Sequence, residues 1–164
     1  PNPQKIAKVG IVLSNIIGLF KGKRKKSNLL KNSVTGKFSK SIKNSKTEID
    51  WLSYNEQNVK NYKDDPLCGE MFTIGSYNAL FHLVSMIDNS KKYKNVNKNL
   101  PILLISGEDD PCTSGEKGRQ VSLKKLQKAG FDNIKVETIK NMRHEILNET
   151  MHQKVYDYIL KFLN

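Results

Sequence analysis

The chain has 164 residues, a hydrophobic share of 37% and a mean hydropathy of −0.56, which suits one packed, water-soluble domain and disfavours a membrane-embedded protein. Its net charge is +12, and the whole excess lies in residues 1–47, which hold twelve lysines and arginines and no acidic residue. Such a segment suits a solvated basic face first and an anionic membrane surface second, whereas nucleic acid is disfavoured because Phe38 is the only aromatic residue between Lys21 and Lys46.

The cysteines and the order of charges near the N-terminus bear on the compartment. Cys68 and Cys112 have no metal-ligand spacing and define no disulfide framework, so we expect reduced thiols in a cytoplasmic protein. The basic cluster Lys21–Lys26 follows the first apolar run, whereas the charges of a signal peptide precede it. The chain opens at Pro1 without methionine, which we interpret as an internal fragment or a trimmed chain.

The N-terminal part of the chain is predicted to be helical. Apolar residues recur over residues 3–20 with the period of an amphipathic helix that packs on its apolar face. They are Ile6, Val9, Val12, Leu13, Ile16, Ile17 and Phe20. Short helices are expected around Leu29, over Phe38–Ile42 and over Asn55–Tyr62, and Asp65–Pro66 breaks the last of these.

A second apolar stripe predicts a core helix over Thr73–Ile87. The stripe consists of Ile74, Tyr77, Leu80, Phe81, Val84 and Ile87. His82 lies within this helix and is expected to be structural. A lysine- and asparagine-rich connection over Asn89–Asn99 follows.

Residues 100–139 have the pattern of a strand, a helix and a second strand. Leu100–Gly107 is a short apolar run that suits a buried parallel strand. A helix is predicted over Ser114–Ala129, where Gly130 would provide a left-handed stop, and Asn133–Ile139 alternates like a strand. A right-handed crossover lays such strands parallel. A final helix over Met151–Leu163 would pack on this sheet.

The loops after these two strands carry an acid, Asp110, and a histidine, His144. Parallel strands end at the same edge of a sheet, so these side chains are expected to meet there, as the orienting acid and the proton-carrying base of a nucleophilic triad do. A serine nucleophile needs glycines two residues before and two after it, and neither Ser76 nor Ser106 nor any other serine satisfies this. We therefore expect the nucleophile upstream of Pro1.

A metal site at His144 is the rival interpretation. His144-Glu145 resembles the start of a zinc-protease helix, but the second histidine would stand at position 148, which is Asn148. Glu149 and His152 are further candidate ligands, although they do not complete a ligand set.

Four segments in order resemble the cap and C-terminal half of bacterial α/β-hydrolases, in the monoacylglycerol lipase and lysophospholipase branch that stands beside serine aminopeptidases. They are Thr47–Ser53, Asp65–Gly69, Leu100–Pro111 and Arg143–Glu149. The resemblance implies the last two parallel strands of that fold with flanking helices, preceded by a helical cap over residues 1–72 and with the core portion over residues 73–164. Trp51 would then be a packing anchor between cap and core, with substrate contact as the alternative.

The same resemblance implies a serine hydrolase that acts on carboxylic esters of lipids and needs no metal or organic cofactor. Asp110, directly before Pro111, would be the triad acid in preference to Asp109, and His144 would be the base. The serine and the oxyanion hole would come from an N-terminal companion segment of the same hydrolase. A peptidase of the same fold and a non-catalytic basic module that binds a membrane or a protein remain the alternatives.

Overall fold

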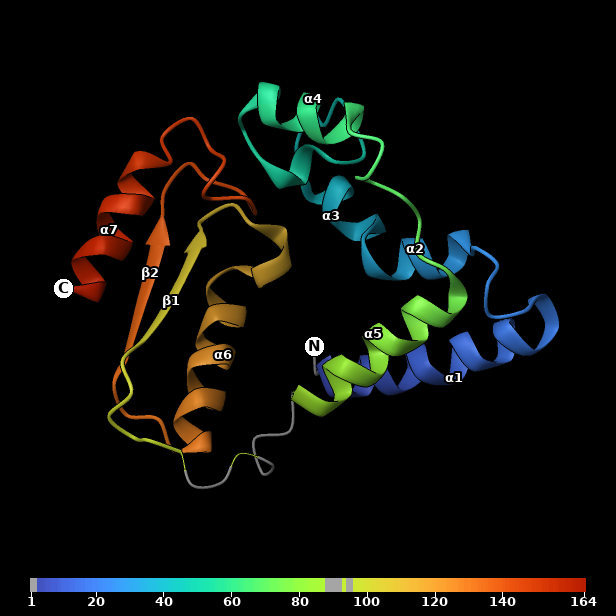
Figure 1. The fold of residues 1–164 in the computed structure, drawn as a ribbon, viewed down its shortest axis with the longest axis horizontal. Helices are drawn as coiled ribbons and strands as arrows, with labels where there is room; N and C mark the ends of the chain where they lie inside the picture. Colours follow the sequence, from blue (N-terminus) through green and yellow to red (C-terminus); the bar gives the residue numbers. More distant parts are fainter. Residues whose placement is uncertain (1–2, 88–92, 94–95) are drawn as a thin grey trace. The chain divides into compact units, whose positions relative to one another are not determined.

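The computed structural model describes residues 3–87, 93 and 96–164 of the chain (Figure 1). The first half contains α1 (Pro3–Lys21), α2 (Asn28–Val34), α3 (Gly36–Ser41), the 3₁₀ turn η1 (Asp50–Leu52), α4 (Glu56–Asp64) and α5 (Ile74–Ile87). The second half contains β1 (Ile102–Gly107), the 3₁₀ turn η3 (Pro111–Thr113), α6 (Gly115–Ala129), β2 (Ile134–Ile139) and α7 (Gln153–Leu163). Each predicted helix and strand is found within a few residues of its expected bounds. The predicted connection Asn89–Asn99 lies in large part outside the described residues.

The chain packs as two compact units. The first consists of Pro1–Lys37 and Glu70–Asn95, and the second of Phe38–Gly69 and Val96–Asn164. The division between these units differs from the boundary expected at residue 72, because α5 packs against α1 and residues 38–69 group with residues 96–164. The assignment of residues 1–72 to a cap stays a prediction.

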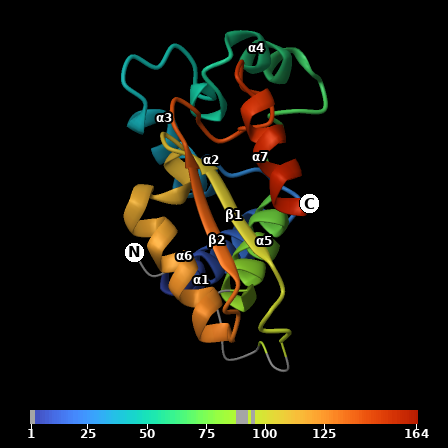
Figure 2. The same ribbon diagram turned by 90° about the vertical axis from the view of Figure 1, so that its left-hand side faces the viewer.

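Helices α1 and α5 lie side by side and hold the first unit together (Figures 1 and 2). Its buried apolar core consists of Leu30, Ile74, Tyr77 and Phe81. The turn after α1 is joined to the start of α5 through the backbone, where the Ile74 amide donates to the Lys25 carbonyl over 2.8 Å. An isolated antiparallel bridge between Lys26 and Thr73 extends this contact.

The face of α1 that is buried in this chain is not the predicted apolar stripe. Most residues of that stripe are more than half exposed, whereas a row of small residues is buried; the row is Ala7, Gly10, Ser14 and Gly18. A Cβ atom at Gly10 would lie 2.7 Å from the Phe81 ring, so α5 approaches too closely for a larger side chain. Asn78 also donates to Ser14 Oγ over 2.8 Å. The predicted burial of the apolar face is met only in part, because Leu13 and Ile17 pack against the core whereas close backbone approach selects the small residues elsewhere.

The second unit is built on the predicted strand-helix-strand crossover. Strands β1 and β2 pair in parallel, with Ile102 opposite Ile134 and Gly107 opposite Ile139. Helices α6 and α7 lie on opposite sides of this strand pair (Figures 1 and 2). Gly130 ends α6 with a φ of +100°, the left-handed conformation that was predicted there. Both strands therefore end at the same edge, and the loops that carry Asp110 and His144 leave from it.

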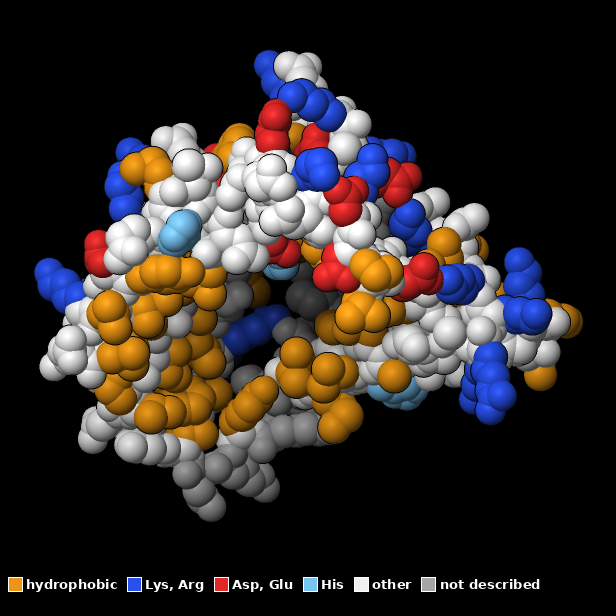
Figure 3. Space-filling model, turned by 45° about the horizontal axis from the view of Figure 1, so that its top comes forward, with side chains coloured by type: hydrophobic (Ala, Val, Ile, Leu, Met, Phe, Trp, Pro, Cys, Tyr) orange, Lys and Arg blue, Asp and Glu red, His pale blue; other side chains and the backbone are white. Residues whose placement is uncertain are grey.

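The strand pair is only partly covered in this chain. Over the described residues β1 pairs with β2 alone, and its residues up to Ser106 are half-buried. Hydrophobic side chains gather over the strands and α7 in Figure 3, and Leu160 and Leu163 of α7 are 56% and 72% exposed. Such a sheet leaves backbone groups and apolar surface without a neighbour. None of the described helices is long and apolar enough to span a membrane.

Candidate active site

The loop after β1, residues 108–114, is here called the acid loop, and Asp110 is its buried carboxylate. Asp110 caps the short turn η3, where its Oδ1 accepts from the Cys112 amide over 2.8 Å. Thr113 Oγ1 donates back to the Asp110 carbonyl over 2.8 Å. Pro111 suits the first position of such a turn because it has no amide hydrogen to leave unpaired. Local sequence thus fixes the backbone of this acid.

The loop after β2, residues 140–149, is here called the histidine loop, and it brings His144 against Asp110. His144 Nδ1 lies 3.1 Å from Asp110 Oδ2, although the residues are 34 positions apart in the chain. The two carboxylate oxygens of Asp110 therefore have different partners, since Oδ1 caps the turn and Oδ2 faces the imidazole. With Asp110 ionised, Nδ1 carries the proton that it donates to Asp110, and Nε2 keeps the lone pair of a base. The expected meeting of these two side chains is confirmed.

Asp110 also sets the protonation of the imidazole. Its hydrogen bond raises the pKa of His144 above the ordinary 6.5, burial opposes this shift, and the charges of Asp110 and Glu145 add to it. The pair therefore stabilises the fold fully below pH 6.5, and this stabilisation is lost as the pH rises through the raised pKa. A neutral, base-competent His144 requires a pH above that raised pKa.

The acid loop and the histidine loop are in direct backbone contact where β1 ends. The Glu108 amide donates to the Ile139 carbonyl over 2.9 Å, and the Asp109 amide donates to the Met142 carbonyl over 3.0 Å. A Cβ atom at Gly107 would overlap the carbonyl oxygens of Met142 and Arg143. Only glycine permits this approach, so Gly107 is a condition for the contact between acid and histidine.

The sequence model of the family described as "Serine aminopeptidase, S33" (Hydrolase_4) matches residues 2–151 of the chain, over both loops. The chain belongs to this family. No curated protein sequence matches it. The membership agrees with the predicted branch, in which monoacylglycerol lipases and lysophospholipases stand beside serine aminopeptidases.

Solved structures share the fold of this S33-family chain. A carboxyl esterase from Bacillus coagulans is 25% identical with a TM-score of 0.79, over 100% of this chain and 52% of the esterase. A lipase in its open form is 17% identical with a TM-score of 0.79, over 99% of this chain and 52% of the lipase. A monoacylglycerol lipase from Paleococcus ferrophilus is 18% identical with a TM-score of 0.56, over 93% of this chain and 51% of the lipase. The α/β-hydrolase fold is thus confirmed, and the chain spans about half the length of these proteins.

In this S33-family chain a segment far from the loops in sequence covers the imidazole. The segment is residues 50–58, here called the Trp51 segment. The Trp51 ring centroid lies 5.1 Å from that of His144 and 5.0 Å from that of Phe38. Trp51 was predicted to anchor residues 1–72 to residues 73–164, and its ring contacts join Phe38 of the first range to His144 of the second, all within the second compact unit.

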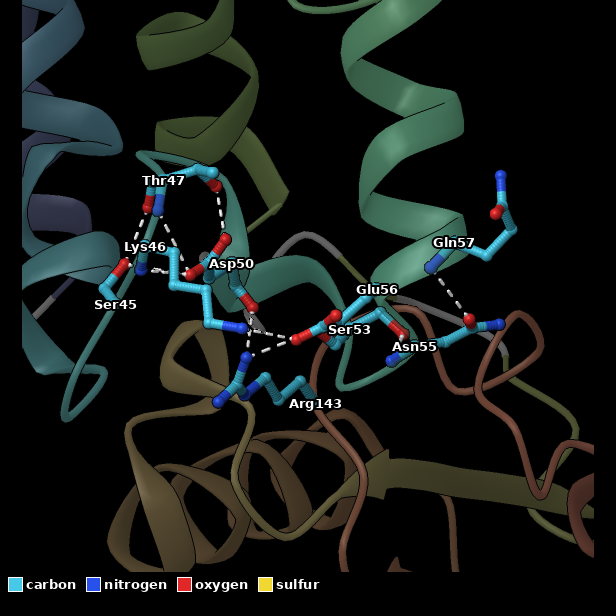
Figure 4. Close-up of polar contacts among 9 residues, drawn as sticks. All are labelled: Ser45, Lys46, Thr47, Asp50, Ser53, Asn55, Glu56, Gln57 and Arg143. Atoms are coloured by element: carbon cyan, nitrogen blue, oxygen red, sulfur yellow. Dashed lines mark hydrogen bonds and ion pairs between the residues drawn. The ribbon is translucent and has the colours of Figure 1, made fainter.

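Arg143, the residue before His144, ties the histidine loop to the Trp51 segment. Its Nη1 donates to the Asp50 carbonyl over 2.6 Å and to the Ser53 carbonyl over 3.2 Å, as Figure 4 shows. Its guanidinium stacks 3.9 Å from the centroid of the Tyr54 ring. Sequence reasoning missed this role because the hydrogen-bond partners of Arg143 lie 90 or more positions away.

Asp109, the competitor of Asp110, has a different partner. Its Oδ2 accepts from Tyr54 Oη over 3.1 Å, and this bond, with burial, raises the pKa of Tyr54. Asp109 therefore ties the acid loop to the Trp51 segment, while Asp110 alone of the two bonds to the imidazole.

The predicted rival metal ligands are otherwise engaged. The Glu149 carboxylate accepts backbone amides, and His152 Nδ1 lies 2.7 Å from the Glu149 carbonyl. Over the described residues a different group of side chains is close enough to bind a metal ion. It consists of Asp110, Cys112 and His144, whose possible ligand atoms lie within 4.8 Å of one another. Burial raises the pKa of the Cys112 thiol to about 12, so without a metal the thiol keeps its proton near neutral pH. The Nδ1 atom of His144 faces Asp110 in this group.

Proposed function

We propose that this chain carries the acid and the base of a serine hydrolase that cleaves carboxylic esters of lipids, such as monoacylglycerols or lysophospholipids. The observation that carries the proposal is the bond between Asp110 and His144 at the edge where both strands end. Membership of the S33 family and the likeness to an esterase and to lipases support the ester chemistry.

In the proposed mechanism His144 takes the proton from a serine hydroxyl while the serine oxygen attacks the ester carbonyl. Asp110 holds the imidazole in the tautomer that leaves Nε2 free and stabilises the imidazolium that forms. His144 then gives the proton to the departing alcohol. In the second half a water molecule, deprotonated by the same ring, attacks the acyl group, the bond to the serine oxygen breaks, and the ring returns the proton to that oxygen.

The nucleophile and the oxyanion hole are proposed to come from an N-terminal companion segment of the same hydrolase. No serine of the chain has glycines at both positions that a nucleophile elbow requires. The half-covered strand β1 and the apolar surface over the strands offer such a segment a sheet edge and a packing face. A cytoplasmic location and contact of the basic residues 1–47 with anionic headgroups remain predictions of the same proposal.

The test uses the complete protein that contains this chain, with His144→Ala as the decisive variant. Wild type is expected to release fatty acid from a monoacylglycerol and a lysophospholipid, and His144→Ala is expected to lower kcat by at least about 10³-fold. His82→Ala is the matched control, because His82 lies in α5 of the first unit. An inactive wild type, or equal activity of His144→Ala, would contradict the proposal.

An aminopeptidase is the second candidate, because the description of the family names that activity. Aminoacyl arylamides in the same assay separate the two candidates. Turnover of the arylamide without turnover of either lipid ester would favour the peptidase. An acidic side chain that holds the substrate amine would then be needed.

A further inference from the structure

Glu149 is a buried carboxylate that the mechanism above does not use. It is 2% exposed, and its neighbours are donors from the histidine loop and from the Trp51 segment. Its Oε2 accepts from Ser53 Oγ over 2.8 Å and from the Asn55 amide over 3.2 Å. Both oxygens lie 3.0 Å from the Tyr54 amide, and Oε1 accepts from the Arg143 amide over 2.9 Å. One carboxylate thus gathers a donor from its own loop and donors from residues 53–55, which lie 94 to 96 positions before it in the chain.

The donor from the histidine loop is the backbone amide of Arg143, the residue next to His144. Fixing this amide fixes the direction in which the chain enters residue 144. The Trp51 segment reinforces the same geometry from the other side, since the Glu145 amide donates to the Leu52 carbonyl over 2.8 Å. Asn55 Nδ2 also donates to the Asn148 carbonyl over 2.9 Å. The backbone is therefore held on both sides of His144, because the Arg143 amide bonds to Glu149 and the Glu145 amide bonds to Leu52 of the Trp51 segment.

The chemistry of this position requires a carboxylate rather than its amide. An ionised Glu149 offers two acceptor oxygens and no donor, which matches a site where every facing group donates. A glutamine would offer one oxygen and turn an NH2 group toward donors. At least one buried donor would then lose its acceptor, and charge-assisted bonds would become neutral.

We propose that Glu149 is a positioning residue for the catalytic base: it clamps the histidine loop to the Trp51 segment and so holds His144 in line with Asp110. This inference rests on the proposed function, in which His144 acts as the base. Glu149 acts through the backbone of Arg143 and does not touch the reacting atoms.

The experiment compares Glu149→Gln with Glu137→Gln in the complete protein, on the ester that wild type hydrolyses. Glu137 is a suitable control because its carboxylate bonds to Tyr158 Oη over 2.7 Å, within the same unit but away from the histidine loop. Glu149→Gln is expected to lower kcat by about 10- to 100-fold with KM within about 2-fold, since small displacements of a catalytic group cost about this much. Glu149→Asp is expected to restore part of the loss.

A pH profile separates positioning from general stability. The groups that shift the pKa of His144 are Asp110 and Glu145, and the Asp110 bond is the dominant cause. If Glu149→Gln loosens that bond, the acidic limb of kcat/KM moves to lower pH. A variant that merely lowered the folded fraction would reduce the rate without moving the limb.

The kinetics of the Glu149 variants decide whether Glu149 positions His144. The inference is overturned if Glu149→Gln folds and its kcat stays within about 2-fold of wild type. It is also overturned if Glu149→Gln and Glu137→Gln show the same loss of kcat and the same acidic limb of kcat/KM. If Glu149→Gln does not fold, Ser53→Ala decides, because it removes one donor and keeps the carboxylate. If Ser53→Ala lowers kcat by about 3-fold or more and moves the acidic limb of kcat/KM to lower pH, the inference is supported. An unchanged kcat in Ser53→Ala overturns it. An inactive wild type contradicts the proposed function, whereas an active wild type with unaffected Glu149 variants contradicts this inference alone.

Discussion

The acid loop and the histidine loop leave neighbouring strands, but Asp110 and His144 are held in place by different kinds of contact. In the acid loop Asp110 bonds to Cys112 and Thr113, two and three residues on. In the histidine loop Arg143 bonds to the Trp51 segment 90 or more positions away, and Glu149 does the same. The acid is thus placed by its own turn, whereas the base is placed by a distant part of the chain.

This difference predicts which substitutions should disturb the geometry of the Asp110–His144 pair. A local turn tolerates changes elsewhere, because its hydrogen bonds form whenever its own few residues are ordered. A loop that depends on distant contacts loses its geometry when any of several packed neighbours changes. We therefore expect the base, rather than the acid, to be the sensitive member of the pair.

Among substitutions that keep both Asp110 and His144, the largest effect is expected at Gly107, where the two loops touch. Gly107→Ala would force a Cβ atom onto the carbonyl oxygens of Met142 and Arg143 and push the histidine loop away. We expect kcat of the complete protein to fall by about 100-fold and the free energy of unfolding to fall by about 1–3 kcal/mol. Steady-state kinetics and denaturant unfolding measure the two quantities.

Gly18→Ala is the matched control for that substitution. A Cβ atom there would meet its nearest neighbours at 3.4 Å, in a helix of the first unit. Its activity should equal that of wild type. If Gly107→Ala behaved the same way, the close contact between the loops would not hold.

The smallest effect is expected at Cys112, inside the self-supporting acid loop. Cys112→Ala keeps the backbone amide that Asp110 accepts and removes only a thiol whose pKa burial raises to about 12. We expect kcat within about 3-fold of wild type and slow alkylation of Cys112 by iodoacetamide at neutral pH. A loss above about 10-fold would show that the thiol takes part in the reaction.

The sequence predicted the parts of the site that follow from local pattern. The crossover, its parallel strands and the left-handed stop at Gly130 follow from residue periodicity and turn chemistry. The meeting of Asp110 and His144 follows from topology, because parallel strands end at one edge. None of these needs knowledge of distant packing.

The remaining features could not be predicted, because they depend on contacts between distant segments. The buried face of α1 is set by the approach of α5 to Gly10, which apolar periodicity does not encode. Glu149 was considered as a metal ligand, and its actual donors lie in the Trp51 segment, 94 to 96 positions away, and at Arg143. An acidic residue in a polar stretch gives no sign that such donors surround it.

The most direct test of the central claim is an NMR titration of His144 in the complete protein, in wild type, Asp110→Asn and Asp109→Asn. We predict a His144 pKa above 6.5 in wild type and in Asp109→Asn, because Asp109 bonds to Tyr54 instead of the imidazole. In Asp110→Asn the pKa should fall, since the bond that dominates the shift is weakened and its charge is lost. The same His144 pKa in wild type and Asp110→Asn would contradict the account.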